Sequence, residues 1–180
     1  MIKLFICGIS GRLGSSIVNE IKKSSSISLI IASTGKGELT EIFNKKSLTI
    51  PVLAAPNLSF GIAFLSILLV QASEKKLPLK KFNIEETHHN KKIDTPSGTA
   101  LMLKKELKEL FKAQDIEIIS NRDESSVGTH KINLYLGSEI LSLEHKALDR
   151  NAFAFGAVKL IEWIQFKTPG FYSLHDAVNN

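Results

Sequence analysis

The stretch Ile2–Gly14, with the sequence IKLFICGISGRLG, decides the fold of this chain. Its first six residues form a short apolar run, which predicts a buried strand over Ile2–Cys7. Three glycines then mark a tight turn, and the apolar spacing beyond them predicts a helix over Leu13–Lys23. A strand that turns through glycines into a helix is the usual setting for a phosphate at a helix N-terminus. Because the spacing is GxxGxxG rather than GxGxxG, a plain strand–helix turn stays an alternative.

Strands and helices alternate over the first sixty residues. After a serine linker, Ser24–Ser26, the pattern predicts a strand over Ile27–Ala32, a short helix around Glu38–Asn44 and a third strand over Ile50–Ala54. This alternation is typical of a parallel sheet.

The rest of the chain follows a different pattern. We expect helices over Ile62–Lys75 and Thr99–Lys112, and strands over Phe82–Thr87, Ile116–Ser120, Thr129–Leu136 and Ile140–Lys146. Three strands in succession indicate an antiparallel or mixed sheet. A last helix, capped by Asp149, is expected to run through Phe166 and to end at Pro169-Gly170. The predicted fold class is α/β: a shortened Rossmann-like parallel sheet (1–59 and 150–180) plus a second α+β domain with a mixed sheet (60–149).

Composition narrows the classes of partner. The chain has 180 residues, is 43% hydrophobic and 23% charged, and carries a net charge of +5, which suits anionic partners. No basic stretch is interleaved with aromatic residues, so we expect no nucleic-acid partner. The single cysteine, Cys7, excludes an internal disulfide and fits a reducing compartment. No signal peptide is visible, and the longest apolar run, Ile62–Val70, is too short for a bilayer. We therefore expect a cytoplasmic protein with no membrane partner.

The stretch Glu86–Ala100, ETHHNKKIDTPSGTA, concentrates the chemistry. His88 and His89 are adjacent near a strand end and should point to opposite faces, so we expect no shared metal. The Ser97-Gly98-Thr99 turn brings hydroxyl and backbone N–H groups to a helix start, which suits a carboxylate. Asp94 is interpreted as an orienting or capping partner. The pattern predicts a site that holds a small dianion and supplies a proton.

Other polar residues give weaker signals. Ser33-Thr34-Gly35-Lys36 follows the second strand with no carboxylate, which favours NADP over NAD if a dinucleotide binds. His130 and His145 lie on predicted strands and could be half-buried, and His175 lies in the tail. Three side chains could add charge to a pocket: Arg122, Lys146 and Arg150. For each of these residues a solvated strand end is the alternative.

With these motifs, the chain resembles the 4-hydroxy-tetrahydrodipicolinate reductase (dihydrodipicolinate reductase) family of diaminopimelate and lysine biosynthesis. Gly8–Gly14 is similar to the family's nucleotide turn, Ala32–Gly35 to its Gly-Thr-Thr-Gly and Ala55–Gly61 to its hinge motif. Glu86–Ala100 reproduces the signature E-x-H-H-x-x-K-x-D-x-P-S-G-T-A. Shorter matches continue through His145–Arg150, Phe153-Ala154, Gly156-Ala157, Pro169-Gly170 and Tyr172.

The resemblance implies reduction of a cyclic imine or enamine dicarboxylate with NADPH or NADH. His88 would be the general acid/base and Lys92 the proton donor. The two substrate carboxylates would be held by His89, Ser97, Gly98, Thr99 and Thr34. The cofactor would be lined by Gly8, Ile9, Ser10, Gly11, Arg12, Leu13, Ala32, Ser33, Thr34, Ala55, Pro56, Asn57 and Leu58. The family also implies a homotetramer built through the strands of the second domain.

The chain is shorter than the family it resembles. The missing segment falls between about Lys23 and Ile30 and would carry several Rossmann strands with the residues that read the adenosine ribose. A strand joined to the first by one helix and a short linker must lie beside it. That slot normally holds the second strand, so either the sheet is rearranged or the cofactor domain is incomplete. Thr129 replaces a usual glutamate, and Asp123-Glu124 stands where glycine is common. The alternatives are an impaired remnant that binds the dicarboxylate or only assembles and, with no motif in its favour, a nucleic-acid binder.

Overall fold

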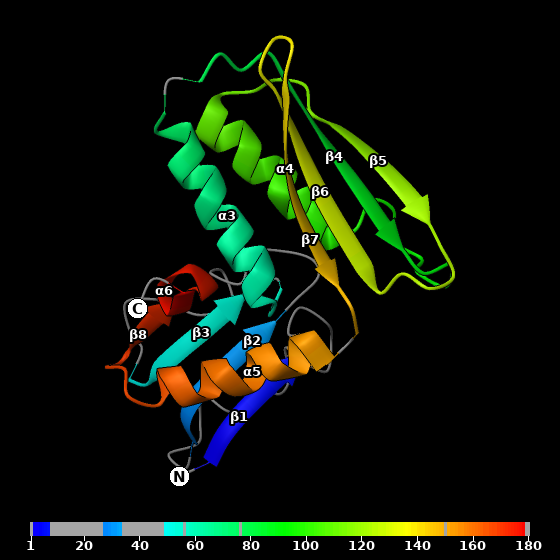
Figure 1. The fold of residues 1–180 in the computed structure, drawn as a ribbon. Helices are drawn as coiled ribbons and strands as arrows, with labels where there is room; N and C mark the ends of the chain where they lie inside the picture. The colour runs from blue at the N-terminus through cyan, green and yellow to red at the C-terminus, as the bar shows by residue number, and fades with distance from the viewer. Residues whose placement is uncertain are drawn as a thin grey trace. The chain divides into compact units, whose positions relative to one another are not determined.

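The computed structural model describes residues 2–7, 27–33, 49–55, 57–75, 77–149 and 151–178. The chain divides into two compact units, Met1–Phe60 with Phe153–Asn180 and Gly61–Ala152 (Figure 1). The helices expected over 13–23 and 38–44 lie outside the described residues.

The first unit contains a parallel sheet, as the alternating pattern predicts. Its four strands are β1 (Ile2–Cys7), β2 (Ile27–Ser33), β3 (Pro51–Ala55) and β8 (Gly170–Tyr172), in the order β1-β2-β3-β8. Each neighbouring pair is parallel. All five residues of β3 are buried, which is typical of a parallel strand covered on both faces. The expectation that the second strand lies beside the first is confirmed.

The C-terminal part of this unit differs from the sequence prediction. Helix α5 (Asn151–Ile164) ends two residues before Phe166, and Gly170 begins β8 instead of only ending a helix. A short helix, α6 (Leu174–Val178), follows. Strand β8 has only three residues, so no periodicity could reveal it. Strand β8 pairs with β3, and its Tyr172 ring contacts the Trp163 ring of α5, with ring centroids 5.5 Å apart.

The second unit is an α+β domain with a mixed sheet, as expected. It comprises α3 (Phe60–Ser73), β4 (Lys81–His88), α4 (Gly98–Phe111), β5 (Glu117–Arg122), β6 (Gly128–Tyr135) and β7 (Ile140–Ala147). The strand order is β5-β4-β6-β7. Strand β4 is parallel to β5 and antiparallel to β6, and β6 is antiparallel to β7.

Helices α3 and α4 cover one face of this sheet (Figure 1). Their apolar side chains form one buried cluster with the strands: Leu65, Leu69, Phe82, Ile84, Ala100, Leu103, Leu107, Ile116, Ile132 and Leu134. The cluster fixes α4, whose N-terminus carries the Pro-Ser-Gly-Thr turn. In the described part of the chain, no helix has the length and apolarity needed to cross a membrane.

Candidate active site

The strand register brings four polar residues into one row across the mixed sheet. Ser120, Glu86, His130 and His145 lie on β5, β4, β6 and β7 and are opposite one another in turn. Directly paired residues share a face of the sheet. The row two residues away is apolar and contains Ile118, Ile84, Ile132 and Leu143. The polar row therefore borders the apolar core on the face that the helices cover.

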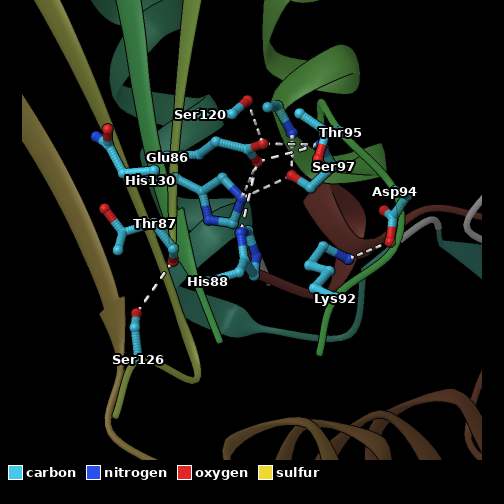
Figure 2. A network of polar contacts seen from close by, with 12 residues as sticks. Glu86, Thr87, His88, Lys92, Asp94, Thr95, Ser97, Ser120, Ser126 and His130 are labelled. Carbon is cyan, nitrogen blue, oxygen red and sulfur yellow. Dashed lines mark hydrogen bonds and ion pairs between the residues drawn. The ribbon is translucent and has the colours of Figure 1, made fainter. Parts of the chain in front are cut away.

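Glu86 is the centre of the row and its side chain is fully buried. The backbone N–H of Ser97 donates to both of its carboxylate oxygens, at 3.0 and 3.2 Å, and the hydroxyl of Ser120 donates to Oε1 at 2.7 Å. Burial raises the pKa of the Glu86 carboxyl group, but the hydrogen bonds from Ser97 and Ser120 outweigh it and leave the pKa below its ordinary value. Glu86 is therefore an ionised group held by three short contacts (Figure 2).

His88 is the last residue of β4 and is 7% exposed. Its Nδ1 lies 3.6 Å from Oε2 of Glu86, and this nitrogen makes no hydrogen bond with any residue that the structure describes. Burial lowers the pKa of His88; Glu86 acts in the opposite direction, and Lys92 and Arg122 lower it further. His88 is thus a neutral imidazole beside a carboxylate, an arrangement that suits proton transfer.

His130 shares the same carboxylate. Its Nε2 lies 3.8 Å from Oε2 of Glu86 and 3.2 Å from Oγ of Ser97, and its ring meets that of His88 edge-on. Burial, with the charge of His88 adding to it, lowers the pKa of His130 to about 4. Sequence reasoning ranked His130 low because nothing local to it signals a site.

The turn after β4 places Lys92 and Asp94. Nζ of Lys92 donates to Oδ1 of Asp94 at 2.8 Å, and this bond, with one from the backbone of Gly98, lowers the pKa of Asp94. Arg122 donates to the carbonyl oxygen of Asp94 at 3.0 Å and to the hydroxyl of Thr95. Asp94 thus contacts Lys92 and Arg122 just before α4, whose N-cap is Ser97, and these contacts fit the orienting role more than the capping role.

The polar groups of Ser97 in the Pro-Ser-Gly-Thr turn are already hydrogen-bonded within the chain. Ser97 was expected to offer free groups to a ligand, but its N–H donates to Glu86 and its Oγ accepts from the N–H of Ala100 at 3.2 Å. The N–H of Gly98 is directed to Asp94. The helix start therefore already holds the Glu86 carboxylate and lies beside that of Asp94, as the positive end of a helix favours.

His89 lies apart from this network. It lines a hollow of about 430 Å³ with the turn and loop residues Asn90, Lys91, Glu124, Ser125, Ser126 and Val127. The different environments of His88 and His89 fit the expectation that adjacent strand-end residues point to opposite faces.

Potential metal ligands also meet in this unit. Nδ1 or Nε2 atoms of His88 and His130 and a carboxylate oxygen of Glu86 all lie within 4.8 Å of one another. The prediction of no metal rests on the His88–His89 pair and on the absence of a Cys or Glu at a fitting spacing, whereas the structure places Glu86 and His130 beside His88. Because Glu86 already accepts three hydrogen bonds, we interpret the trio as a proton site in which two imidazoles adjoin one carboxylate.

Most residues expected to line the cofactor lie outside the described residues: Gly8, Ile9, Ser10, Gly11, Arg12, Leu13, Thr34 and Pro56. Ala32 and Ser33 end β2, Ala55 ends β3, and Ala55 and Leu58 are buried. Asn57 accepts a bond from the backbone of Ser59 at 2.8 Å. Cys7 pairs with Ser33 and Ser33 with Ala55, so the three candidate segments leave the sheet at the same carboxyl edge. Nucleotides bind at this edge in doubly wound folds.

Comparisons with known proteins agree with this arrangement. The family model described as "Dihydrodipicolinate reductase, C-terminus" matches residues 61–178. A 4-hydroxy-tetrahydrodipicolinate reductase of Bdellovibrio bacteriovorus is 38% identical over 141 residues, covering 78% of this chain and 59% of that protein. Enzymes of the same name from Rickettsia akari and Campylobacter lari are 36% and 34% identical, covering 84% and 83% of this chain and 67% and 70% of theirs. The chain thus spans 59% to 70% of the length of these three relatives.

A solved structure gives the same fold. The dipicolinate-bound dihydrodipicolinate reductase from Paenisporosarcina sp. TG-14 superposes with a TM-score of 0.64 at 15% identity, covering 96% of this chain and 97% of that one. The family model covers well over half of the chain, and the Campylobacter lari relative passes 30% identity with more than two thirds of its length covered. The chain therefore belongs to the dihydrodipicolinate reductase family.

Proposed function

We propose that this chain is an NAD(P)H-dependent oxidoreductase of lysine and diaminopimelate biosynthesis that reduces the cyclic dicarboxylate 4-hydroxy-tetrahydrodipicolinate. One observation carries the proposal: the Glu86–Ala100 signature folds so that His88 and the Ser97 turn meet on one buried carboxylate. The names of the relatives support the substrate class, as does the dipicolinate bound to the reductase from Paenisporosarcina.

The chain's own residues supply charge, protons and orientation. A substrate carboxylate entering at the start of α4 would replace Asp94 at the N–H of Gly98 and at Nζ of Lys92. Lys92, released from Asp94, would then stand ready to give a proton, and His88 would exchange one with the ring. Ser97, Thr99 and Thr34 stay proposed carboxylate contacts, and His89 would contribute from its own hollow.

NADPH or NADH would supply the hydride. The described residues fit such a group in one respect, because β1, β2 and β3 are parallel and end together at the carboxyl edge of the sheet, where nucleotides bind. The hydroxyls of Ser33 and Thr34 and the charge of Lys36 favour NADPH.

The test measures NAD(P)H oxidation with the cyclic substrate. We expect His88→Gln and Lys92→Ala to lower turnover by about 10²- to 10⁴-fold, the usual share of acid–base groups. Lys108→Ala, an exposed change in the last turn of α4, is the matched control and should leave turnover unchanged. Binding of dipicolinate without any NADPH or NADH binding in calorimetry would reject the reductase and support the impaired remnant.

We further propose a homotetramer in the cytoplasm. The face of the mixed sheet away from α3 and α4 carries a ladder in which Ser142 donates to Asn133 and Asn133 to Asn83, together with exposed Ile140. A surface of this kind suits pairing with another copy. Analytical ultracentrifugation should show smaller species for Ile140→Glu than for Leu101→Glu on the helix side; equal assembly of the two variants would contradict the proposed surface.

A further inference from the structure

Glu86 has no part in the proposed proton transfer itself, yet it is more deeply buried than His88 or Lys92. It is 0% exposed and accepts hydrogen bonds from two other segments, the Ser97 turn and β5. An ionised carboxylate is costly to bury unless it is well paired, so the presence of one at this position needs a physical reason.

The geometry supplies that reason. One oxygen of Glu86, Oε2, lies 3.6 Å from Nδ1 of His88, 3.8 Å from Nε2 of His130 and 3.2 Å from the N–H of Ser97. A single atom therefore adjoins the acid/base imidazole, a second imidazole and the turn that receives the carboxylates (Figure 2). Catalytic hydrogen bonds are often long in unliganded enzymes and shorten in the complex.

The backbone on the other side restricts His88 as well. A Cβ on Gly128 would stand 3.1 Å from Nε2 of His88, so the ring is confined between this glycine and Glu86. With Nδ1 turned toward Glu86, a proton on Nδ1 is stabilised by the carboxylate, which leaves Nε2 for exchange with a ligand.

We propose that Glu86 is the positioning residue of this site, which orients His88 through Nδ1 and at the same time fixes the Ser97 turn. Proton exchange and dicarboxylate binding are then coupled through one buried carboxylate. The inference rests on the proposed function for the identity of the ligand, but the coupling is a property of the chain alone.

The test compares Glu86→Gln with Glu85→Gln. Glu85 is adjacent on β4 but on the opposite face, where it accepts from Asn133 at 2.7 Å, so the control makes the same chemical change away from the site. The titration of the His88 imidazole is followed by NMR. Groups that face His88 from the surrounding elements are Glu86 on β4, His130 on β6, Arg122 on β5, and Lys92 and Asp94 in the turn.

The expected result follows from the sign of the Glu86 charge. The carboxylate raises the pKa of His88, so Glu86→Gln should lower that pKa, Glu85→Gln should leave it unchanged, and Glu86→Asp should give an intermediate value. Dipicolinate affinity in calorimetry should fall about tenfold in Glu86→Gln, since the N–H of Ser97 would then donate to a neutral amide oxygen instead of a charged carboxylate and the turn would be held less firmly. If Glu86→Gln does not fold, the intermediate pKa of Glu86→Asp carries the test.

Three outcomes would overturn the inference. The first is a His88 titration that is the same in wild type, Glu86→Gln and Glu86→Asp. The second is an equal loss of dipicolinate affinity in Glu85→Gln. The third is stoichiometric Zn²⁺ binding that disappears in Glu86→Gln, because it would make the trio a metal site. None of these measurements uses NAD(P)H, so a chain that fails as a reductase but shows the coupling would reject the proposed function alone.

Discussion

Gly128→Ala tests how tightly His88 is held. The new Cβ would lie 3.1 Å from Nε2 and 3.2 Å from Cδ2 of His88, about 0.3 Å short of the 3.4 Å at which ordinary contact begins. The ring has little room to retreat, because Glu86 stands 3.6 Å from Nδ1 and the His130 ring is edge-on with its centroid 5.1 Å away. The imidazole must therefore move by a few tenths of an ångström within a filled space.

Two energies set the expected stability change. Overpacking of this kind costs about 1–3 kcal/mol, while alanine in place of glycine in a strand returns about 0.5–1 kcal/mol. We expect a net loss of roughly 0–2.5 kcal/mol in the free energy of unfolding, measured by urea denaturation. A displacement of 1 Å at a reacting group can lower a rate by about 10²-fold, so a shift of a few tenths of an ångström should lower turnover roughly three- to tenfold.

The assay is NAD(P)H oxidation with the cyclic substrate, alongside the His88 imidazole resonance in NMR. Gly170→Ala is the control, because its Cβ would meet the ring of Tyr172 at 3.5 Å or more, which is ordinary contact. Wild-type turnover and an unmoved His88 resonance in a folded Gly128→Ala protein would refute the reasoning.

Three further predictions concern stability. Ser97→Ala removes the cap on the N–H of Ala100 and should lower the free energy of unfolding by about 1 kcal/mol, with Ser97→Thr nearer to wild type; equal urea midpoints would contradict this. Leu107 is fully buried, so Leu107→Ala should lower the free energy of unfolding by about 2–5 kcal/mol. Leu101 is half exposed, so Leu101→Ala should lower it by about 0.5 kcal/mol or less. Similar losses in the two variants would argue against the core described here. His130 has a pKa of about 4 when folded and 6.5 as its ordinary value, so the unfolded chain binds more protons between these pH values. Stability should therefore fall on acidification from pH 6.5 to 4, by up to about 3 kcal/mol, and His130→Asn should flatten the curve measured by denaturation at each pH.

Local motifs made part of the site predictable. His88, Lys92 and Ser97 all belong to one fifteen-residue stretch, so spacing alone brings them together. His130 and Ser120 join them through the pairing of β4 with β6 and β5, which is non-local and which no single-segment pattern reveals. One usable signal was missed: Glu86 and His88 are two apart in a strand and so must share a face.

The positions of strands, which depend on local sequence, were predictable, whereas the pairing of strands far apart in the sequence was not. The strands of both sheets were located within about two residues because their apolar runs are continuous or alternate regularly. Strand β8 escaped because three residues carry no period, and its place beside β3 depends on the return of the chain after α5. The mixed sheet was predictable in kind, while the parallel pairing of β5 with β4 required the structure.

The order of the parallel sheet bears on the choice between a rearranged and an incomplete cofactor domain. In the usual doubly wound order, 3-2-1-4-5-6, the first strand borders both the second and the fourth. In this chain β2, β3 and β8 lie in turn on one side of β1, in the places that strands four, five and six of the usual order would take. If strands two and three of the usual order are absent, each described strand can keep the neighbours that it has in that order. The order therefore favours incompleteness over rearrangement. If the cofactor domain is incomplete, the absent part would be the one that reads the adenosine ribose, whereas β1, β2 and β3 end at one edge of the sheet. A cofactor held at that edge would then depend on its nicotinamide and phosphate contacts, and a weakened affinity for NADPH would be the first measurable effect.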